Sequence, residues 1–319
     1  MALITRTLLL LLAGLVFFFL AGIVAVWAPD KPLAELVPRW AEAPSQFITV
    51  AGQQVHVRDE GPRDDPLPVV LLHGTSDSLH TWNGWAAQLR GQRRVIRFDL
   101  PGFGLTGPDA AADYSMDAYV RFVAAVLDRL EAPRVVLGGN SLGGEIAWRV
   151  AFEMPQRVAQ LILVDAGGYP TQPQEIPLGF ALARTMGART ALEYLLPRGL
   201  VLASVRSVYG DPTHVTPELV DRYYDMALRS GNRRALVQRL EAMQGVDASD
   251  RIRALKLPTL VLWGAQDRLI PVEFGRRFAQ DIAGASLIVF DGLGHVPHQE
   301  DPVRTVSEVQ RFLGLVPQK

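Results

Sequence analysis

The feature that most constrains this chain is a junction in which a strand-like run meets a helix-like run at a serine. Residues 135–137 read Val-Val-Leu, which favours a buried strand, and residues 142–152 carry apolar side chains at helical spacing. Between them, residues 139–143 read Gly-Asn-Ser-Leu-Gly, the pattern G-x-S-x-G. Small neighbours leave room for a strained corner, which would present the hydroxyl of Ser141 at a helix N-terminus. An ordinary helix-capping serine is the alternative interpretation.

The order of strand followed by helix recurs through most of the chain. Apolar runs such as PLPVVLLHG, RRVIRFDLPGFG, QLILVDAGG, LPTLVLWGAQD and ASLIVFDGLGH each end in residues that break a strand. Helical spacing marks Met116–Leu130, Leu142–Phe152 and Arg304–Phe312, and the runs QFITV and QQVHVRDEG meet at a hairpin signal, Ala51-Gly52. Apolar strands that alternate with helices predict an α/β fold, with a mostly parallel central sheet covered by helices on both faces.

Between residues 168 and 250 this alternation stops, and the spacing is helical only. An all-helical insertion between two strands of such a sheet predicts a helical cap over one end of the sheet. The predicted organisation is a membrane anchor or signal at residues 1–28, a linker at 29–45, an α/β core at 46–167 and 251–319, and the cap at 168–250.

The N-terminus is a long uncharged apolar segment. From Thr7 to Ala28 there are about 22 residues without charge, and as a helix they span roughly 30 Å, the thickness of a bilayer core. A secretory signal usually has a shorter apolar region, of about 7–15 residues. With Arg6 at the near edge, the segment predicts a single-pass protein of a bacterial inner membrane whose catalytic domain faces the periplasm. A secreted protein, cleaved after Ala28, and a buried soluble helix are the alternatives.

Composition excludes several kinds of chemistry. The chain has no cysteine, so disulfides, thiolate nucleophiles and cysteine-bound zinc are excluded. A net charge of −1 gives no attraction to nucleic acid. His56, His80 and His214 lack metal-ligand spacing, and the glycines match neither a phosphate-binding loop nor a dinucleotide fingerprint. We therefore expect no metal, no cofactor and no nucleic-acid partner.

Two further residues supply what a serine nucleophile needs. A hydroxyl requires a base, and the base requires a group that orients it. His295, in GLGHVPHQEDP, follows one apolar strand, and Asp267, in LWGAQDRLIP, follows the preceding one, so both lie at strand ends that gather at one edge of a parallel sheet. The order serine, acid, histidine is that of the strand–turn–helix type. We therefore predict Ser141 as the nucleophile, His295 as the base and Asp267 as the acid.

Further site residues are predicted around these three. The motif HGTS follows another apolar strand, and the backbone N–H groups of Thr75 and Leu142 are expected to form an oxyanion hole. Tyr169 and Phe180, near or in the cap, and His298, in the last of the loops, are the predicted substrate-binding side chains.

The motifs LLHGTSD, FDLPGFGLT, GNSLGG, LWGAQDRLIP and GLGHVPHQEDP, in this order, resemble the α/β-hydrolase fold superfamily. The resemblance runs from about residue 47 to the C-terminus, includes a helical cap, and implies a triad of Ser141, His295 and Asp267. Haloalkane dehalogenases and epoxide hydrolases of this fold attack with an aspartate at the corner, where this chain has serine. The chain also resembles bacterial lipases and esterases with a hydrophobic N-terminus. It resembles, too, the C–C bond hydrolases of aromatic degradation, which carry further glycines where this chain has Thr-Ser-Asp.

These observations predict a serine hydrolase of carboxylic esters that works through an acyl-enzyme. The apolar N-terminus and the apolar cap favour lipid-like or acyl esters as substrates, so lipase, esterase or phospholipase activity is expected. One alternative is C–C bond hydrolysis or acyl transfer by the same triad. The other is a membrane-anchored, non-catalytic binding protein of the same fold.

Overall fold

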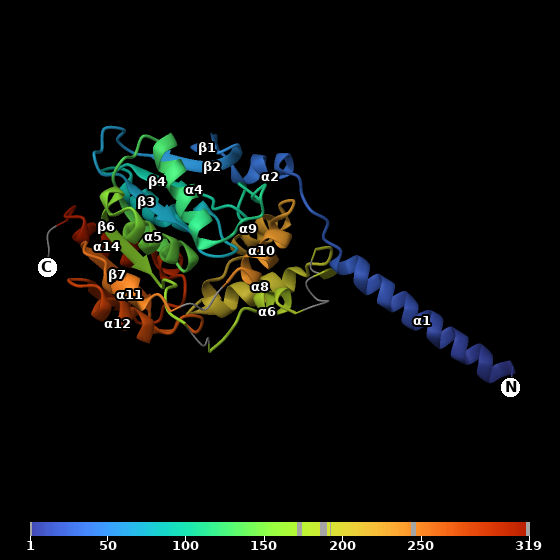
Figure 1. Cartoon of the computed structure of the whole chain (residues 1–319). Helices are drawn as coiled ribbons and strands as arrows, with labels where there is room; N and C mark the ends of the chain where they lie inside the picture. Colours follow the sequence, from blue (N-terminus) through green and yellow to red (C-terminus); the bar gives the residue numbers. More distant parts are fainter. Residues whose placement is uncertain (1, 171–173, 186–189, 192, 244–246, 317–319) are drawn as a thin grey trace.

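One sheet forms the centre of this computed structural model, which describes residues 2–170, 174–185, 190–191, 193–243 and 247–316. In these residues eight strands lie in the order β1-β2-β4-β3-β5-β6-β7-β8 (Figure 1). The strands are β1 (Ser45–Val50), β2 (Gln53–Glu60), β3 (Val69–Leu72), β4 (Val95–Phe98), β5 (Val135–Asn140), β6 (Val158–Val164), β7 (Thr259–Gly264) and β8 (Ser286–Phe290). Among these strands the pairs β1–β2 and β2–β4 are antiparallel, and the other pairs are parallel. The predicted mostly parallel sheet is therefore confirmed.

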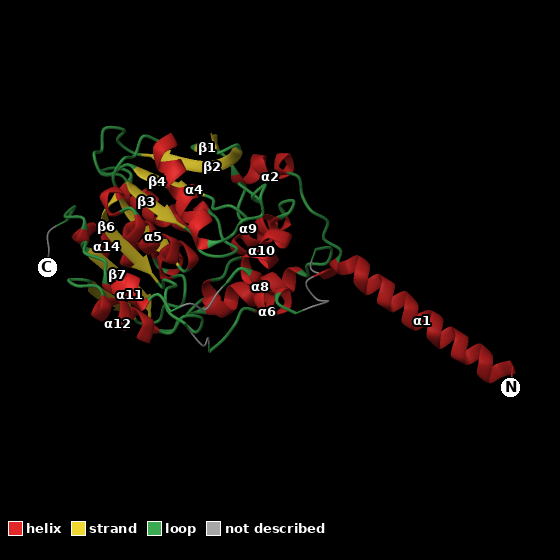
Figure 2. Cartoon of the chain, viewed as in Figure 1, coloured by secondary structure: helices red, strands yellow, loops and turns green. Residues whose placement is uncertain are grey.

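Helices cover both faces of the sheet (Figure 2). One face carries α3 (Asn83–Leu89) and α14 (Pro302–Phe312), and the other carries α4 (Met116–Arg129), α5 (Leu142–Glu153), α11 (Ser249–Arg253) and α12 (Val272–Asp281). Short pieces join them: η1 (Leu79–Trp82), η2 (Pro155–Arg157) and α13 (Pro297–Glu300).

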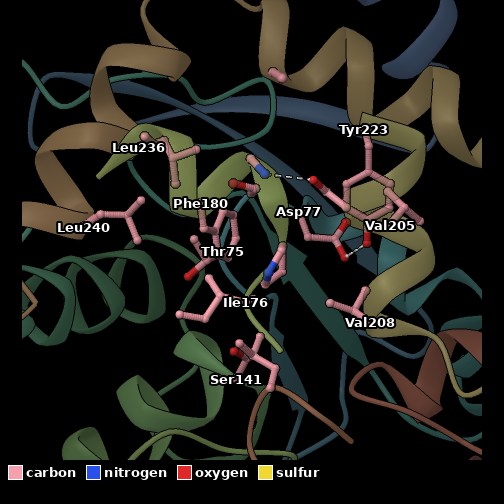
Figure 3. A pocket seen from close by; sticks show the side chains of 18 of the residues that line it. Thr75, Asp77, Ser141, Ile176, Phe180, Val205, Val208, Tyr223, Leu236 and Leu240 are labelled. Carbon is pink, nitrogen blue, oxygen red and sulfur yellow. Dashed lines mark hydrogen bonds between the residues drawn. The ribbon is translucent and has the colours of Figure 1, made fainter. Parts of the chain in front are cut away.

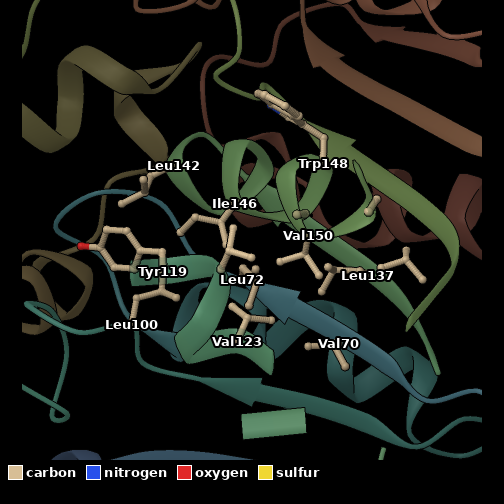
Figure 4. Close-up of a cluster of buried hydrophobic side chains, with 14 of the residues drawn as sticks. Val70, Leu72, Leu100, Tyr119, Val123, Leu137, Leu142, Ile146, Trp148 and Val150 are labelled. Atoms are coloured by element: carbon tan, nitrogen blue, oxygen red, sulfur yellow. The ribbon is translucent and has the colours of Figure 1, made fainter. Parts of the chain in front are cut away.

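The inner strands are buried on both faces, which explains their continuous apolar runs. All four residues of β3 are buried. Figure 4 shows part of the core on one face, where Leu72 and Leu137 of the sheet pack with Val123 of α4 and Ile146 of α5. This packing fixes the carboxyl ends of β3 and β5, where the loops of the site begin.

Helices and loops make up the described chain between β6 and β7. The helices before α11 are α6 (Leu178–Ala183), α8 (Arg198–Val208), α9 (Pro217–Leu228) and α10 (Asn232–Glu241), with a 3-10 turn η3 (Pro212–His214). We call α6, α8, α9 and α10 the cap. The start of α9 is encoded locally, because the Thr216 hydroxyl accepts the amide N–H of Leu219 and Pro217 takes the first helical position. Residues 186–189 and 192 of the expected helical run lie outside the described residues.

The apolar N-terminal segment forms α1 (Ala2–Val26), which projects away from the rest of the molecule (Figure 1). Its residues Ile4–Val26 are long and apolar enough to cross a membrane, and the window of highest hydropathy is 0% buried against the protein. A signal sequence passes the same test. The helix is therefore consistent with a membrane span or with a signal sequence.

The segment expected to be a linker contains α2 (Leu33–Trp40), a helix that the four prolines and mixed charges of this segment did not indicate. Asp225 of α9 accepts hydrogen bonds from Nζ of Lys31 at 2.7 Å and from Nε1 of Trp40 at 2.8 Å. Nη2 of Arg233, in α10, donates to Asp30 at 2.6 Å. The residues that follow α1 are therefore fixed to the cap by ion pairs and hydrogen bonds.

Candidate active site

Ser141 stands at the corner between β5 and α5 in a strained backbone conformation, with φ 54° and ψ −115°. The flanking glycines explain how the corner forms. A Cβ at Gly139 would lie 2.2 Å from the carbonyl carbon of Gly143, and a Cβ at Gly143 would lie 2.2 Å from the carbonyl oxygen of Leu72. The side chain of Ser141 makes no helix-capping hydrogen bond, so the interpretation as an ordinary cap is wrong. The corner presents the hydroxyl to the cavity described below.

Asp267 and His295 form a buried pair at the ends of β7 and β8. Nδ1 of His295 lies 2.7 Å from Oδ2 of Asp267. The other oxygen of Asp267 accepts the amide N–H groups of Leu269 at 2.8 Å and Ile270 at 2.9 Å. Since the Asp267 carboxylate can only accept a hydrogen bond, Nδ1 of His295 carries the hydrogen between them. Nε2 of His295 then has a free lone pair, which a general base needs to accept a proton.

The loop after β3 lies close to Ser141. A Cβ at Gly74 would lie 3.3 Å from the Cβ of Ser141, so the loop backbone approaches the serine closely. In the described residues no group accepts a hydrogen bond from the backbone N–H of Thr75 or of Leu142. Two free amides, one of them at a helix N-terminus, suit the binding of an oxyanion, and this role for Thr75 and Leu142 stays a prediction.

A cavity of about 270 Å³ lies between the core and the cap. Ser141 and His295 line it from the core, next to Thr75 and Asp77. The cap lines it mainly with apolar side chains, which include Phe180, Leu200, Val205, Leu236, Val237 and Leu240. Figure 3 shows Ser141 at one end of this cavity, with Leu236 and Leu240 on one wall and Val205 on the opposite wall. Its mainly apolar lining suits an apolar ligand.

Of the three predicted substrate-binding side chains, only Phe180 lines the cavity. Tyr169 instead packs on the core: its ring lies 4.8 Å from that of Phe278 and 4.1 Å from the Arg277 guanidinium, and its hydroxyl donates to Asp281 at 3.0 Å. Tyr169 is not among the residues that line this cavity, and its role in substrate binding stays a prediction.

His298 also lies outside the residues that line the cavity, and its role in substrate binding stays a prediction. The ring stacks on Trp82 at 4.0 Å, and Nε2 lies 2.8 Å from the hydroxyl of Thr81. The side chain is fully buried, and burial lowers the pKa of His298 well below its usual value, so the ring is neutral. Its position is set by α13, which turns residues after His295 into the core.

Sequence reasoning missed the polar contact that joins the cap to the loop after β3. Asp77 follows Thr75 and Ser76, and its Oδ2 accepts the hydroxyl of Tyr223, from α9, at 2.7 Å (Figure 3). Nη2 of Arg222 lies 3.4 Å from Oδ1 of the same carboxylate. Burial, followed by the charge of Asp77, raises the pKa of Tyr223, so its hydroxyl keeps the proton that it donates. A tyrosine within an amphipathic helix gives no signal of such a role.

Asp165 is a second residue that the sequence interpretation missed, although it follows β6 as Asp267 follows β7. Its side chain lies close to those of Asp267 and His295, and each of the three offers an atom that could bind a metal ion within 4.8 Å of the others. Among the described residues, no other group of three or more His, Asp and Glu side chains is this close. Internal hydrogen bonds already use Asp267 and His295. The expectation of no metal and no cofactor stays a prediction.

Comparison with known proteins gives a family match over residues 68–302, to the alpha/beta hydrolase fold. A 2-hydroxy-6-oxo-2,4-heptadienoate hydrolase of Pseudomonas putida is 32% identical over 278 residues, covering 84% of this chain and 95% of the relative. A solved meta-cleavage product hydrolase from Pseudomonas fluorescens aligns with a TM-score of 0.74 at 25% identity, covering 85% of this chain and 97% of that chain. A solved membrane phospholipase A, described as a bacterial virulence factor, aligns with a TM-score of 0.73 at 23% identity, covering 98% of this chain and 97% of that chain.

Proposed function

Since the chain belongs to the alpha/beta hydrolase fold family, we propose that it is a serine hydrolase that cleaves carboxylic esters with an extended apolar acyl chain. In this proposal Ser141 is the nucleophile, His295 the base and Asp267 the group that orients His295. The backbone amides of Thr75 and Leu142 bind the oxyanion. In this mechanism the only other reactant besides the ester is water.

The reaction proceeds in two halves. Oγ of Ser141 attacks the ester carbonyl carbon while Nε2 of His295 takes the hydroxyl proton, and the amides of Thr75 and Leu142 donate to the oxygen that becomes negative. The carbon–oxygen bond to the alcohol then breaks, and His295 returns the proton to the leaving oxygen. Water attacks the acyl-enzyme in the same way, His295 takes a proton from it, and Ser141 regains its proton as the acid leaves.

The observation that carries the ester proposal is the apolar lining of the cavity. From Ser141 the space leads into the cap, where Leu200, Val205, Leu236 and Leu240 are among its walls. Burial of each methylene of an acyl chain in such a site contributes about 0.8 kcal/mol, so a longer chain binds more tightly until the space is filled.

The position of α1 supports a lipid as the source of that chain. Ala28, two residues beyond α1, packs in one cluster with Leu196 and Leu228. Leu196 also lines the cavity, as does Ala227 next to Leu228. The wall that separates the cavity from the end of α1 is therefore thin and apolar. If α1 spans a membrane, a bilayer lies close to the site, and acylglycerols or phospholipids are the expected ester class.

Hydrolysis of a C–C bond is the second candidate, and the relatives favour it over the ester proposal. The named relatives are a 2-hydroxy-6-oxo-2,4-heptadienoate hydrolase and a meta-cleavage product hydrolase. Arg184 and Arg233 line the cavity and offer a partner to an anionic substrate. One feature argues against this candidate: Asp77, in the loop after β3, lines the same cavity as Ser141 and would repel a carboxylate held close to Ser141. Acyl transfer to an alcohol other than water uses the same first half-reaction.

A fluorophosphonate probe tests the nucleophile first. Labelling of the full-length protein, lost in Ser141→Ala, is the expected result, and an unlabelled wild type would favour a non-catalytic binding protein. Rates with p-nitrophenyl esters of increasing acyl length and with phospholipid vesicles then test the substrate class. Faster hydrolysis of the longer esters supports the proposal. A preference for acetyl esters with no activity on lipid would remove the lipid part, and turnover of a ring-fission dienoate alone would establish the second candidate.

A further inference from the structure

Asp165 is a buried carboxyl that the proposed reaction does not use. It follows β6 directly, its φ is 44°, and it is 0% exposed. Oδ1 accepts the backbone N–H of Gly264 at 3.0 Å, whereas Oδ2 has no hydrogen-bond donor among the described residues. A carboxylate oxygen that is buried without a donor costs free energy, so the charge state of Asp165 requires a physical explanation.

The groups that face Asp165 are themselves titratable. Potential ligand atoms of Asp165, Asp267 and His295 lie within 4.8 Å of one another, and the charge of Glu300 also acts on Asp165. Glu300 accepts the backbone N–H of Gly294 at 2.7 Å. Two ionised carboxylates this close, away from water, repel each other strongly. Asp165 and Asp267 are therefore expected to hold one proton between them.

The hydrogen-bond donors decide which of the two carries that proton. Asp267 accepts from three groups, the amides of Leu269 and Ile270 and Nδ1 of His295, and donors to a carboxylate favour its charged form. Asp165 accepts from one. We therefore propose that Asp165 is a neutral carboxylic acid whose Oδ2–H donates to Asp267 and holds that carboxylate in place for His295.

The electrostatic surroundings agree with this assignment. Burial, followed by the negative charge of Asp267, raises the pKa of Asp165 well above its usual value. The kinetic part of the proposal rests on the proposed function, in which Asp267 orients His295. Asp165 is then a positioning residue. Its proton adds a fourth hydrogen bond to the Asp267 carboxylate, on the side that faces β6, and so holds that carboxylate in place.

Infrared spectroscopy tests the protonation without any assay of activity. The carbonyl stretch of a protonated carboxylic acid lies above the carboxylate bands, and we expect it in the wild-type protein at pH 7 to 8 and not in Asp165→Asn. Labelling the wild type with aspartate that carries ¹³C in its side-chain carboxyl should shift the band, because the band comes from an aspartate and not from Glu300. This labelling tests the protonation even if Asp165→Asn does not fold. A wild-type spectrum with no protonated aspartate at these pH values overturns the proposal.

Two substitutions test the positioning role through the pH–rate profile. Asp165→Asn keeps a neutral group with an N–H donor, so kcat and the acidic limb of the kcat/KM profile should stay as in the wild type. Asp165→Val keeps a similar volume without the donor, and we expect kcat to fall about tenfold with KM unchanged, since a hydrogen bond to a charged group is lost. If Asp165 were ionised, Asp165→Asn would remove a negative charge near His295 and move the acidic limb to lower pH by about one unit, which would overturn the proposal.

These outcomes are distinguishable from failure of the proposed function. If Ser141→Ala retained full activity, the kinetic test of Asp165 would lose its basis, but the infrared band would still report whether the Asp165–Asp267 pair shares a proton. If the band were present and Asp165→Val retained wild-type kcat with unchanged pH dependence, the positioning role would be excluded.

Discussion

The two walls of the cavity are built in different ways. The core wall comprises Ser141 and His295, together with Asp267 behind them, and each is held by the end of a strand and by hydrogen bonds to the backbone or to one another. The cap wall comprises side chains of short helices such as α6 and α10, which line the space through apolar contacts. In the proposed reaction, the core wall therefore breaks the bond and the cap wall selects the substrate. Substitutions in the core wall should change the rate for all substrates, and substitutions in the cap wall should change the rate for some.

The largest effect is expected for Ser141→Ala. Without the hydroxyl no acyl-enzyme forms, and we expect hydrolysis of every ester tested to fall by at least about 10⁴-fold. Initial rates with a short and a long p-nitrophenyl ester give the measurement, and an unchanged thermal midpoint is the control for folding. Equal residual activity on both esters agrees with the role of the core wall. Loss of hydrolysis for only one of the two esters would contradict the proposed division of roles between the core wall and the cap wall.

Asp267→Asn should have the next largest effect. The amide N–H₂ can donate to Nδ1 of His295, which then places the ring hydrogen on Nε2, where a base needs a free lone pair. We expect kcat to fall by about 10⁴-fold, measured with the same two esters. Asp291→Asn, an exposed aspartate in the segment that leads to His295, is the matched control and should retain wild-type activity. Wild-type kcat in Asp267→Asn would remove Asp267 from the site.

A bulky residue in the cap should separate substrates instead of lowering every rate. Leu240, in α10, lines the cavity, and Leu240→Trp fills space that an acyl chain would occupy. Loss of about two buried methylenes corresponds to roughly a tenfold decrease in kcat/KM for long esters, with short esters unaffected. Arg234→Trp, at an exposed position of the same helix, is the control. A uniform decrease for short and long esters would mean that the cap does not select chain length.

The sequence predicts the core wall better than the cap wall for a physical reason. The corner at Ser141 needs small residues at fixed offsets, and Asp267 and His295 each follow an apolar strand, so local patterns bring all three to one edge of the sheet. Their joint catalytic role remains a prediction, but their positions agree with it. Tyr169 and His298 do not line the cavity because their rings pack on Phe278 and on Trp82. These contacts join distant parts of the chain, and residue spacing does not encode them.

Two other features, α2 and the role of Asp165, depend on contacts between distant segments and therefore could not be predicted from the sequence. α2 contains a proline and mixed charges, and its position depends on Asp225, far along the chain in the cap. Asp165 directly follows β6, where the sequence shows only the end of a strand. Its significance comes from its closeness to Asp267, which lies in the loop after β7, the next strand of the sheet. The sequence indicates which residues follow a strand, whereas the structure shows which of their side chains lie in contact.

The smallest effect is expected where the two walls touch. Tyr223→Phe removes the hydroxyl that donates to Asp77 and so loosens the link between α9 and the loop that contains Thr75. We expect kcat to fall about three- to tenfold for short and long esters alike, because the loop supplies a proposed oxyanion donor for every ester. Tyr224→Phe, the adjacent tyrosine, which contacts the cluster of Ala28 and Leu228, is the control and should leave kcat unchanged. If Tyr223→Phe instead raised KM for long esters alone, the hydrogen bond from Tyr223 to Asp77 would contribute to substrate binding by the cap wall. The positions of the oxyanion amides would then not depend on the cap.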